Sequence, residues 1–318
     1  MIEAIRNLLN SKTGSVIKLL VSLGILFFFF FTVDYEKLSL ITSRLNYTYA
    51  FLMLVLILAG NFIAAVRFRL LISVKKTIRI FDLMKQYFIG SFFNNFLPTA
   101  IGGDAVRMFL VSQFGIPKTT AAFFIIVERL IGFYSLICIA FLSSFFWGVP
   151  RHLSIFVTVL LLSCSLVMAA IFSPRINSLF KKFNLRIFDQ ITGNINLLRS
   201  DRAIISATFI LSICYQLVSI SISYCVAMAI NLHIPVISFL TLVPLVWIVT
   251  MIPVSFGGLG LRELSFIYLL AQINIPKEGA LIVSLGTYGA LITSGIIGMF
   301  FFLSGRLKNI GALETNHT

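Results

Sequence analysis

Charge is what this sequence lacks most. Only 11% of its 318 residues are Asp, Glu, Lys or Arg, against about 25% in an ordinary soluble domain. Apolar residues make up 59% of the chain, and the mean hydropathy is +1.02. This composition excludes a soluble globular protein, a disordered chain and a collagen-like repeat.

Residues for metal or disulfide chemistry are also scarce. The three histidines stand at or near the ends of apolar segments, and the four cysteines lie within such segments without CxxC spacing. We therefore predict no metal site, no cofactor and no disulfide scaffold. No segment alternates apolar and polar residues over the length of a strand, which favours an all-α fold.

Long apolar runs predict a polytopic helical membrane bundle, because about 20 apolar residues cross the hydrocarbon core. Two segments, 82–115 and 236–273, are interrupted by proline and glycine and are interpreted as re-entrant hairpins. In the alternative topology both of these segments cross the membrane fully. The first run lacks a small-residue cleavage site and is interpreted as a retained signal-anchor. About six full spans are expected, near 16–33, 47–66, 120–147, 153–172, 203–230 and 279–303.

The net charge of +14 is carried mainly by loops beside the membrane. Counting Lys and Arg in these loops places both termini in the cytoplasm, with the protein in the inner (plasma) membrane. Arg67 is counted here among the cytoplasmic loop residues, whereas the outside loops keep only Lys37, Arg44, Arg151 and Lys277. The charge distribution therefore predicts a membrane partner and no nucleic-acid partner.

An internal repeat is the most informative feature of the sequence. Residues 96–107 read FLPTAIGGDAVR and residues 251–262 read MIPVSFGGLGLR, with proline, Gly-Gly and arginine at the same offsets. An Ile-Pro-Lys triplet and a long apolar run follow each copy. Three full spans separate the copies, so the pattern predicts an inverted repeat of about 82–147 and about 236–303 within a single domain, 1–318.

Charged residues near these repeats require partners, because each costs ~2.5–3.5 kcal/mol unpaired at the centre of a span. Asp104 and Arg107 are three residues apart and can meet on one helix face. Two interpretations stay open: an ion-pair clasp that holds the hairpins, or a polar cavity where arginines and the N–H groups beside the glycines meet a phosphate. The charged set is Asp104, Arg107, Glu128, Arg129, Arg262 and Glu263.

Weaker signals accompany this set. A stripe of Ser212, Gln216, Ser219 and Ser223 either bridges neighbouring helices or lines a cavity, and Asn61, Asn94 and Asn95 add amide groups. The segment of about 175–199 is predicted to be a basic amphipathic helix on the cytoplasmic leaflet.

The segments FFNNFLPTAIGGDAVR, VERLIGF and PVSFGGLGLRE together resemble the lysylphosphatidylglycerol synthase/flippase transmembrane family. The resemblance covers nearly the whole chain and implies two re-entrant hairpins that move phospholipid or glycolipid head groups between leaflets. Bifunctional members carry a soluble aminoacyl-transferase domain after the membrane part, and this chain ends soon after Arg306, so we expect no lipid aminoacylation. The substrate-binding residues that the resemblance implies are Gly102, Gly103, Asp104, Arg107, Glu128, Arg129, Gly257, Gly258, Arg262 and Glu263.

The expected function is a lipid translocase for an anionic or zwitterionic head group, without catalytic residues and not an enzyme. The sequence leaves homo-oligomerisation open. One alternative is a membrane glycosyltransferase that uses a polyprenyl-phosphate sugar. Such an enzyme would require a pair of acidic residues in an external loop, and the only acidic residues predicted in the external loops are Asp34, Glu36 and Glu278. The other is a proton-coupled transporter of a small anion, with Asp104 or Glu128 carrying the proton.

Overall fold

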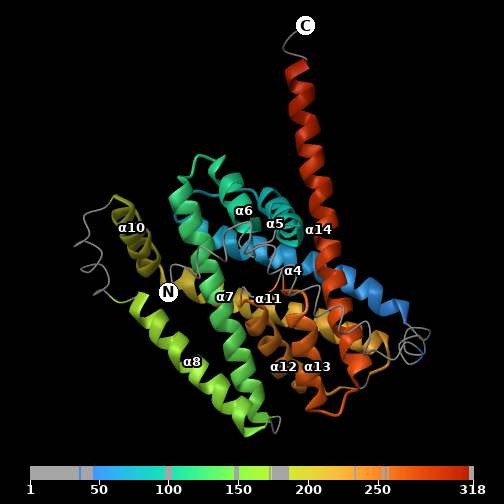
Figure 1. Ribbon diagram of the computed structural model, residues 1–318. Coiled ribbons are helices and arrows are strands. Elements are labelled where there is room, and N and C mark those ends of the chain that lie inside the picture. The colour runs from blue at the N-terminus through green and yellow to red at the C-terminus, as the bar shows by residue number, and fades with distance from the viewer. Residues whose placement is uncertain are drawn as a thin grey trace.

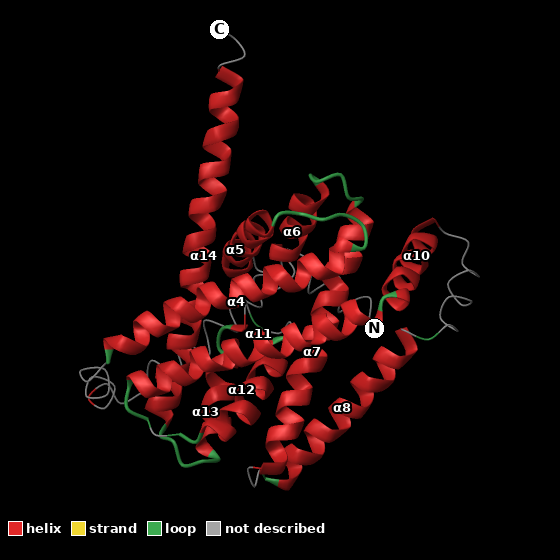
Figure 2. Ribbon diagram, turned by 180° about the vertical axis from the view of Figure 1, so that it is seen from behind, coloured by secondary structure: helices red, strands yellow, loops and turns green. Residues whose placement is uncertain are grey.

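The computed structural model describes Glu36 and residues 46–96, 102–146, 150–171, 173, 186–232, 234–252, 255 and 258–314. Within these ranges every regular element is a helix (Figures 1 and 2). The predicted all-α fold is confirmed.

Five of the helices are long and apolar enough to cross a membrane. They confirm five of the six predicted spans and make the protein a multi-pass integral membrane protein. The predicted span 16–33 lies outside the described residues. The five helices are α4 (Tyr47–Ser73), α7 (Lys118–Phe146), α8 (Arg151–Ile171), α11 (Arg202–Ala229) and α14 (Lys277–Glu314).

Helix α4 continues beyond the end that the sequence predicted. It begins after Asn46, whose side-chain oxygen accepts a 3.0 Å hydrogen bond from the Thr48 N–H, and it ends at Ser73 instead of 66. Arg67 is therefore a helical residue, 6% exposed, and its assignment to a cytoplasmic loop is wrong. The apolar residues after Arg67 extend the buried face of the helix by more than one turn.

Two pairs of short helices occupy the predicted hairpins. The first pair is α5 (Ile80–Phe96) and α6 (Gly102–Ser112), and the second is α12 (Val236–Thr250) and α13 (Leu261–Ala271). The helices of each pair pack against one another. Helices α6 and α13 have 11 residues each, about 17 Å at 1.5 Å per residue, which is too short to cross ~30 Å of hydrocarbon. Their lengths agree with re-entrant hairpins, whose depth in the membrane stays a prediction.

The two pairs lie at opposite ends of the bundle, and the helices that follow them run in opposite directions. In Figure 1, α7 descends from the end where α6 lies, and α14 ascends from the end where α13 lies. Each pair also packs against the long helix that follows the other: α5 lies along α14, and α12 lies against α7. Helices α4 and α11 pack along one another across the bundle. This arrangement agrees with an inverted repeat.

Helix α10 (Arg186–Ser200) corresponds to the second half of the predicted amphipathic segment. It packs on α7 and α11, and its Ile195 and Leu198 side chains are 3% and 0% exposed. The first part of that segment, 175–185, lies outside the described residues. Placement of α10 on a leaflet surface remains a prediction.

The opposed directions of α7 and α14 give a test of the topology. Lys118 and Lys277 are exposed at the first turns of these two helices. We expect single cysteines at these positions, in a chain without the four native cysteines, to react with a membrane-impermeant maleimide from opposite sides of the membrane. Modification of both from the same side would contradict the inverted repeat.

Candidate functional site

A buried carboxylate in α7 joins three helices. Glu128 is 1% exposed, and its Oε1 accepts hydrogen bonds from Nη2 and Nε of Arg67 on α4 at 2.5 and 3.1 Å. Its Oε2 accepts a 2.9 Å hydrogen bond from Nη2 of Arg107 on α6. Both arginines are themselves buried, at 6% and 7% exposed. A single acid therefore holds α4 and the second helix of the first hairpin against α7.

Two further charged residues extend this group. Arg107 Nη1 lies 3.6 Å from Asp104 Oδ1, which confirms the predicted pair. The other oxygen of Asp104 accepts a hydrogen bond from Nε of Arg129, whose side chain is 48% exposed. We call Arg67, Asp104, Arg107, Glu128 and Arg129 the charge cluster; its three bases and two acids carry a net formal charge of +1.

Aromatic rings surround the buried arginines. The Tyr87 hydroxyl donates a hydrogen bond to Glu128 Oε1, and its ring centroid lies 3.8 Å from the guanidinium carbon of Arg107. The Tyr215 ring lies 5.0 Å from the guanidinium carbon of Arg67. Such cation–π contacts add to the ion pairs because the ring face is electronegative. The sequence prediction missed Tyr87, Tyr215 and the role of Arg67.

Glycines allow the two helices of the first hairpin to cross in contact. A Cβ on Gly103 would lie 2.1 Å from the Gly90 carbonyl oxygen and 2.6 Å from the side chain of Asn94. A Cβ on Gly90 would lie 2.9 Å from Cδ of Arg107. Gly102 and Gly103 are both buried at the start of α6. The N–H of Gly103 donates a 2.8 Å hydrogen bond to Asn94 Oδ1, so one of the backbone groups predicted to meet an anion has a partner within the chain.

The second hairpin uses its charged residues differently. Gly258 and Gly260 have positive φ angles of 80° and 84° at the start of α13, conformations that favour glycine. The Glu263 carboxylate accepts hydrogen bonds from the Gly260 N–H at 2.6 Å and from the Ser284 hydroxyl at 3.3 Å. The guanidinium carbon of Arg262 lies 4.7 Å from the centroid of the Tyr288 ring. Gly257 lies outside the described residues.

The repeat alignment explains this difference in chemistry. At the positions equivalent to Asp104 and Glu128, the second copy has Leu259 and Thr287. The two positions that supply acidic partners to Arg107 in the first copy therefore supply none to Arg262 in the second. No three His, Cys, Asp or Glu residues within the described ranges are close enough to hold a metal ion.

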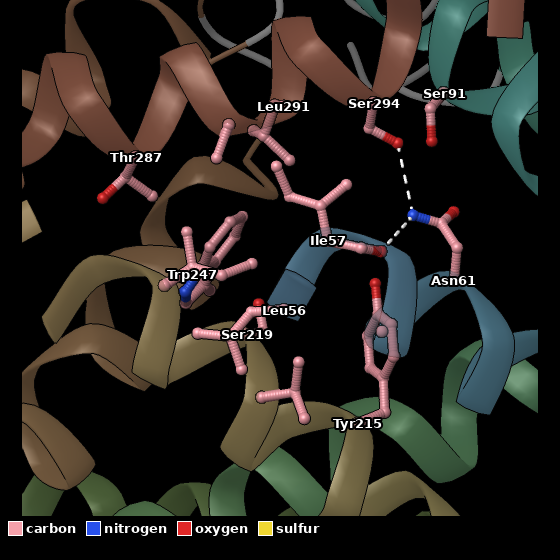
Figure 3. Close-up of a pocket in the computed structure, with 14 residues that line it drawn as sticks. Leu56, Ile57, Asn61, Ser91, Tyr215, Ser219, Trp247, Thr287, Leu291 and Ser294 are labelled. Atoms are coloured by element: carbon pink, nitrogen blue, oxygen red, sulfur yellow. Dashed lines mark hydrogen bonds between the residues drawn. The ribbon is translucent and has the colours of Figure 1, made fainter. Parts of the chain in front are cut away.

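A cavity of about 90 Å³ lies among helices from both hairpins and three of the long helices (Figure 3). Ser91 from α5 and Trp247 from α12 both line it, together with residues of α4, α11 and α14. Tyr215 belongs to the lining and also contacts Arg67, so the cavity adjoins the charge cluster. Its polar lining residues are Asn61, Ser91, Tyr215, Ser219, Trp247, Thr287 and Ser294.

The predicted polar stripe of α11 serves both of its proposed roles. Ser212 accepts a 3.2 Å hydrogen bond from Arg67 Nη1, Gln216 donates to the Gly132 carbonyl oxygen at 3.0 Å, and Ser223 lies 3.1 Å from the Thr287 hydroxyl oxygen. These three residues bridge neighbouring helices, whereas Ser219 lines the cavity. Of the three asparagines, Asn61 lines the cavity, and Asn95 instead donates to the Leu291 carbonyl oxygen at 2.9 Å.

These features define an integral membrane helical bundle with a polar interior. Residues 15–298 match the family described as the lysylphosphatidylglycerol synthase transmembrane region, and the chain belongs to that family. The family relates the protein to membrane lipids and agrees with the resemblance found in the sequence. Comparisons with curated proteins and with solved structures find no match.

Proposed function

We propose that this protein moves the head group of a phospholipid or glycolipid between the two leaflets of the membrane. The observation that carries the proposal is the cavity between α5 and α12, which places seven polar side chains inside an apolar bundle. Polar groups at membrane depth are costly unless they line a wet or ligand-binding space. In this proposal the head group passes through the cavity while its acyl chains stay in the lipid.

The charge cluster supports this function by its position and its net charge. The cluster carries a net formal charge of +1, and its Arg67 contacts Tyr215, which lines the cavity. This positive charge beside the cavity favours the approach of an anionic or zwitterionic head group. Its ion pairs also fix α6, so Arg107 serves as a clasp whether or not it reaches a phosphate. The engagement of Glu128 by two arginines and Tyr87 argues against Glu128 as a proton carrier, which leaves Asp104 for the small-anion transporter alternative. The proposal involves no covalent step.

Filling the cavity tests this function. Gly60 lines the cavity, and a Cβ there would make only an ordinary contact, 3.5 Å from Val218. We expect Gly60→Leu to extend into the cavity and to slow lipid movement about tenfold or more in vesicles containing a fluorescent phospholipid or glycolipid, read by chemical quenching of the outer leaflet.

Gly289→Leu is the matched control, because a Cβ on Gly289 would meet no atom within 4 Å. This variant should move the lipid at the rate of the unmodified protein. Equal rates for Gly60→Leu and the unmodified protein would contradict the cavity as the pathway, and absence of lipid movement by the unmodified protein would contradict the function itself.

A further inference from the structure

The cavity contains hydrogen-bonding groups that the described chain does not satisfy. Trp247 Nε1 is buried and has no hydrogen-bond partner among the described residues. The hydroxyls of Ser91, Tyr215 and Ser219 likewise make no hydrogen bond within that part of the chain. Asn61 uses its amide N–H₂ toward the Ile57 carbonyl oxygen and Ser294, at 2.8 and 3.4 Å. Its oxygen therefore remains available to a ligand.

These groups surround one space. In Figure 3, Trp247 lies at the left of the cavity and Asn61 and Ser91 lie at the right, while Ser219 and Tyr215, one turn apart on α11, lie along its lower side. An unsatisfied buried polar group costs free energy. Trp247 Nε1 is the cavity atom that is both buried and without a partner among the described residues, whereas Ser91, Tyr215 and Ser219 are half-buried beside it. Water or a ligand in the cavity would complete these hydrogen bonds.

The hydrogen-bond donors and acceptors in the cavity indicate which chemical groups a ligand there would carry. The indole N–H of Trp247 only donates, the Asn61 oxygen only accepts, and the three hydroxyls do both. A phosphate can satisfy only donors, and an ammonium can satisfy only acceptors. Hydroxyl groups satisfy both kinds, because each one donates and accepts.

Charge gives an independent argument against an ammonium group. None of the described residues that line the cavity is Asp, Glu, Lys or Arg. The guanidinium of Arg67 lies over the Tyr215 ring of the cavity wall, 5.0 Å from its centroid. A head-group ammonium there would be desolvated without a carboxylate partner and beside a cation, which is unfavourable.

We infer that the cavity binds the uncharged, hydroxyl-bearing end of a lipid head group. The inference rests on the proposed function and narrows its substrate class. Two sources carry this chemistry: the terminal glycerol of a glycerophospholipid and the sugar of a glycolipid. A cavity needs at least roughly 10–15 Å³ to hold one water, so the cavity of about 90 Å³ has room for the few hydroxyl groups of a glycerol.

Intrinsic fluorescence measures this binding directly, because the sequence has two tryptophans and Trp147→Phe leaves Trp247 as the sole reporter. The full-length Trp147→Phe protein in detergent is titrated with short-chain phosphatidylglycerol, glucosyl diacylglycerol and phosphatidylethanolamine. We expect Trp247 emission to change with at least one hydroxylated lipid, whose identity distinguishes glycerol from sugar, and not with phosphatidylethanolamine. An equal or tighter response to phosphatidylethanolamine, or no response to any of the three, overturns the inference.

Ser219→Ala tests whether a cavity hydroxyl contributes to lipid binding. The Ser219 hydroxyl has no partner among the described residues, so its loss should leave the melting temperature unchanged or higher while weakening binding of the hydroxylated lipid about fivefold. Ser163→Ala is the control, because Ser163 is exposed on α8, away from the cavity, and its hydroxyl donates to the Leu160 carbonyl oxygen of its own helix. Unchanged binding by Ser219→Ala contradicts the assigned site.

Transport of the same three head groups separates the inference from the proposed function. Movement of labelled phosphatidylethanolamine as fast as the hydroxylated lipids would overturn the inference and leave the translocase function standing. Binding of a hydroxylated lipid without movement of any lipid would support the inference and contradict the translocase function.

Discussion

Glu128→Ala is expected to lower the free energy of unfolding by about 3–5 kcal/mol, because it removes the partner of two buried cations. Arg67 and Arg107 are 6% and 7% exposed, and both donate hydrogen bonds to this carboxylate. Among the described acids, Arg107 would keep Asp104 alone, at 3.6 Å, besides its contact with the Tyr87 ring. Denaturant titration of the purified protein in detergent micelles, followed by tyrosine and tryptophan fluorescence, measures the change.

A combined variant distinguishes loss of charge balance from loss of packing. Arg67→Met, Arg107→Met and Glu128→Leu together remove the buried charges and keep comparable side-chain volume, so most of the lost stability should return. Stability of Glu128→Ala within about 1 kcal/mol of the unmodified protein, the range of an exposed ion pair, would show that the cluster does not hold the three helices together.

Gly103→Ala is expected to separate the helices of the first hairpin and to abolish lipid movement. The added methyl group would lie 2.1 Å from the Gly90 carbonyl oxygen and 2.6 Å from Asn94. Backbone atoms must move to relieve such an overlap, and overpacking typically costs about 1–3 kcal/mol. The displacement of α6 would also move Arg107 away from Glu128. Transport in vesicles and the melting temperature in detergent report the two effects.

Gly289→Ala is the matched control for this substitution, since its Cβ would meet open space within a helix. It should preserve transport and raise stability by roughly 0.5–1 kcal/mol, the usual difference between alanine and glycine in a helix. Normal transport and stability of Gly103→Ala would mean that the α5–α6 contact adjusts without functional consequence.

Part of the charge cluster could be predicted from local spacing. Asp104 and Arg107 lie one helical turn apart, and this relation does not depend on the rest of the fold. Arg67 could not be recognised in the same way, because a cation at the end of an apolar run resembles a residue flanking a membrane span. Its partner Glu128 is 61 residues away in sequence, and only the packing of α4 against α7 brings them together.

The residues that line the cavity could be predicted from the sequence only in small part. Asn61 and Ser219 stood out as polar residues in apolar helices, but Trp247 lies in the sequence VISFLTLVPLVWIVT, where it reads as one more apolar side chain. Its indole N–H is available to a ligand because the packing of α12 places Trp247 at a cavity that α4, α11 and α14 also line. Periodicity predicts which residues form helices, but it does not determine which of them face one another.

The crossed packing of the two hairpins limits how this protein can move. A Cβ on Gly298 of α14 would lie 1.9 Å from the Phe88 carbonyl oxygen of α5, so these helices are in backbone contact. Each predicted repeat therefore contributes one hairpin helix to a contact with the other repeat: α5 packs on α14, and α12 packs on α7. The two repeats can rock as separate rigid bodies only if the α5–α14 backbone contact breaks.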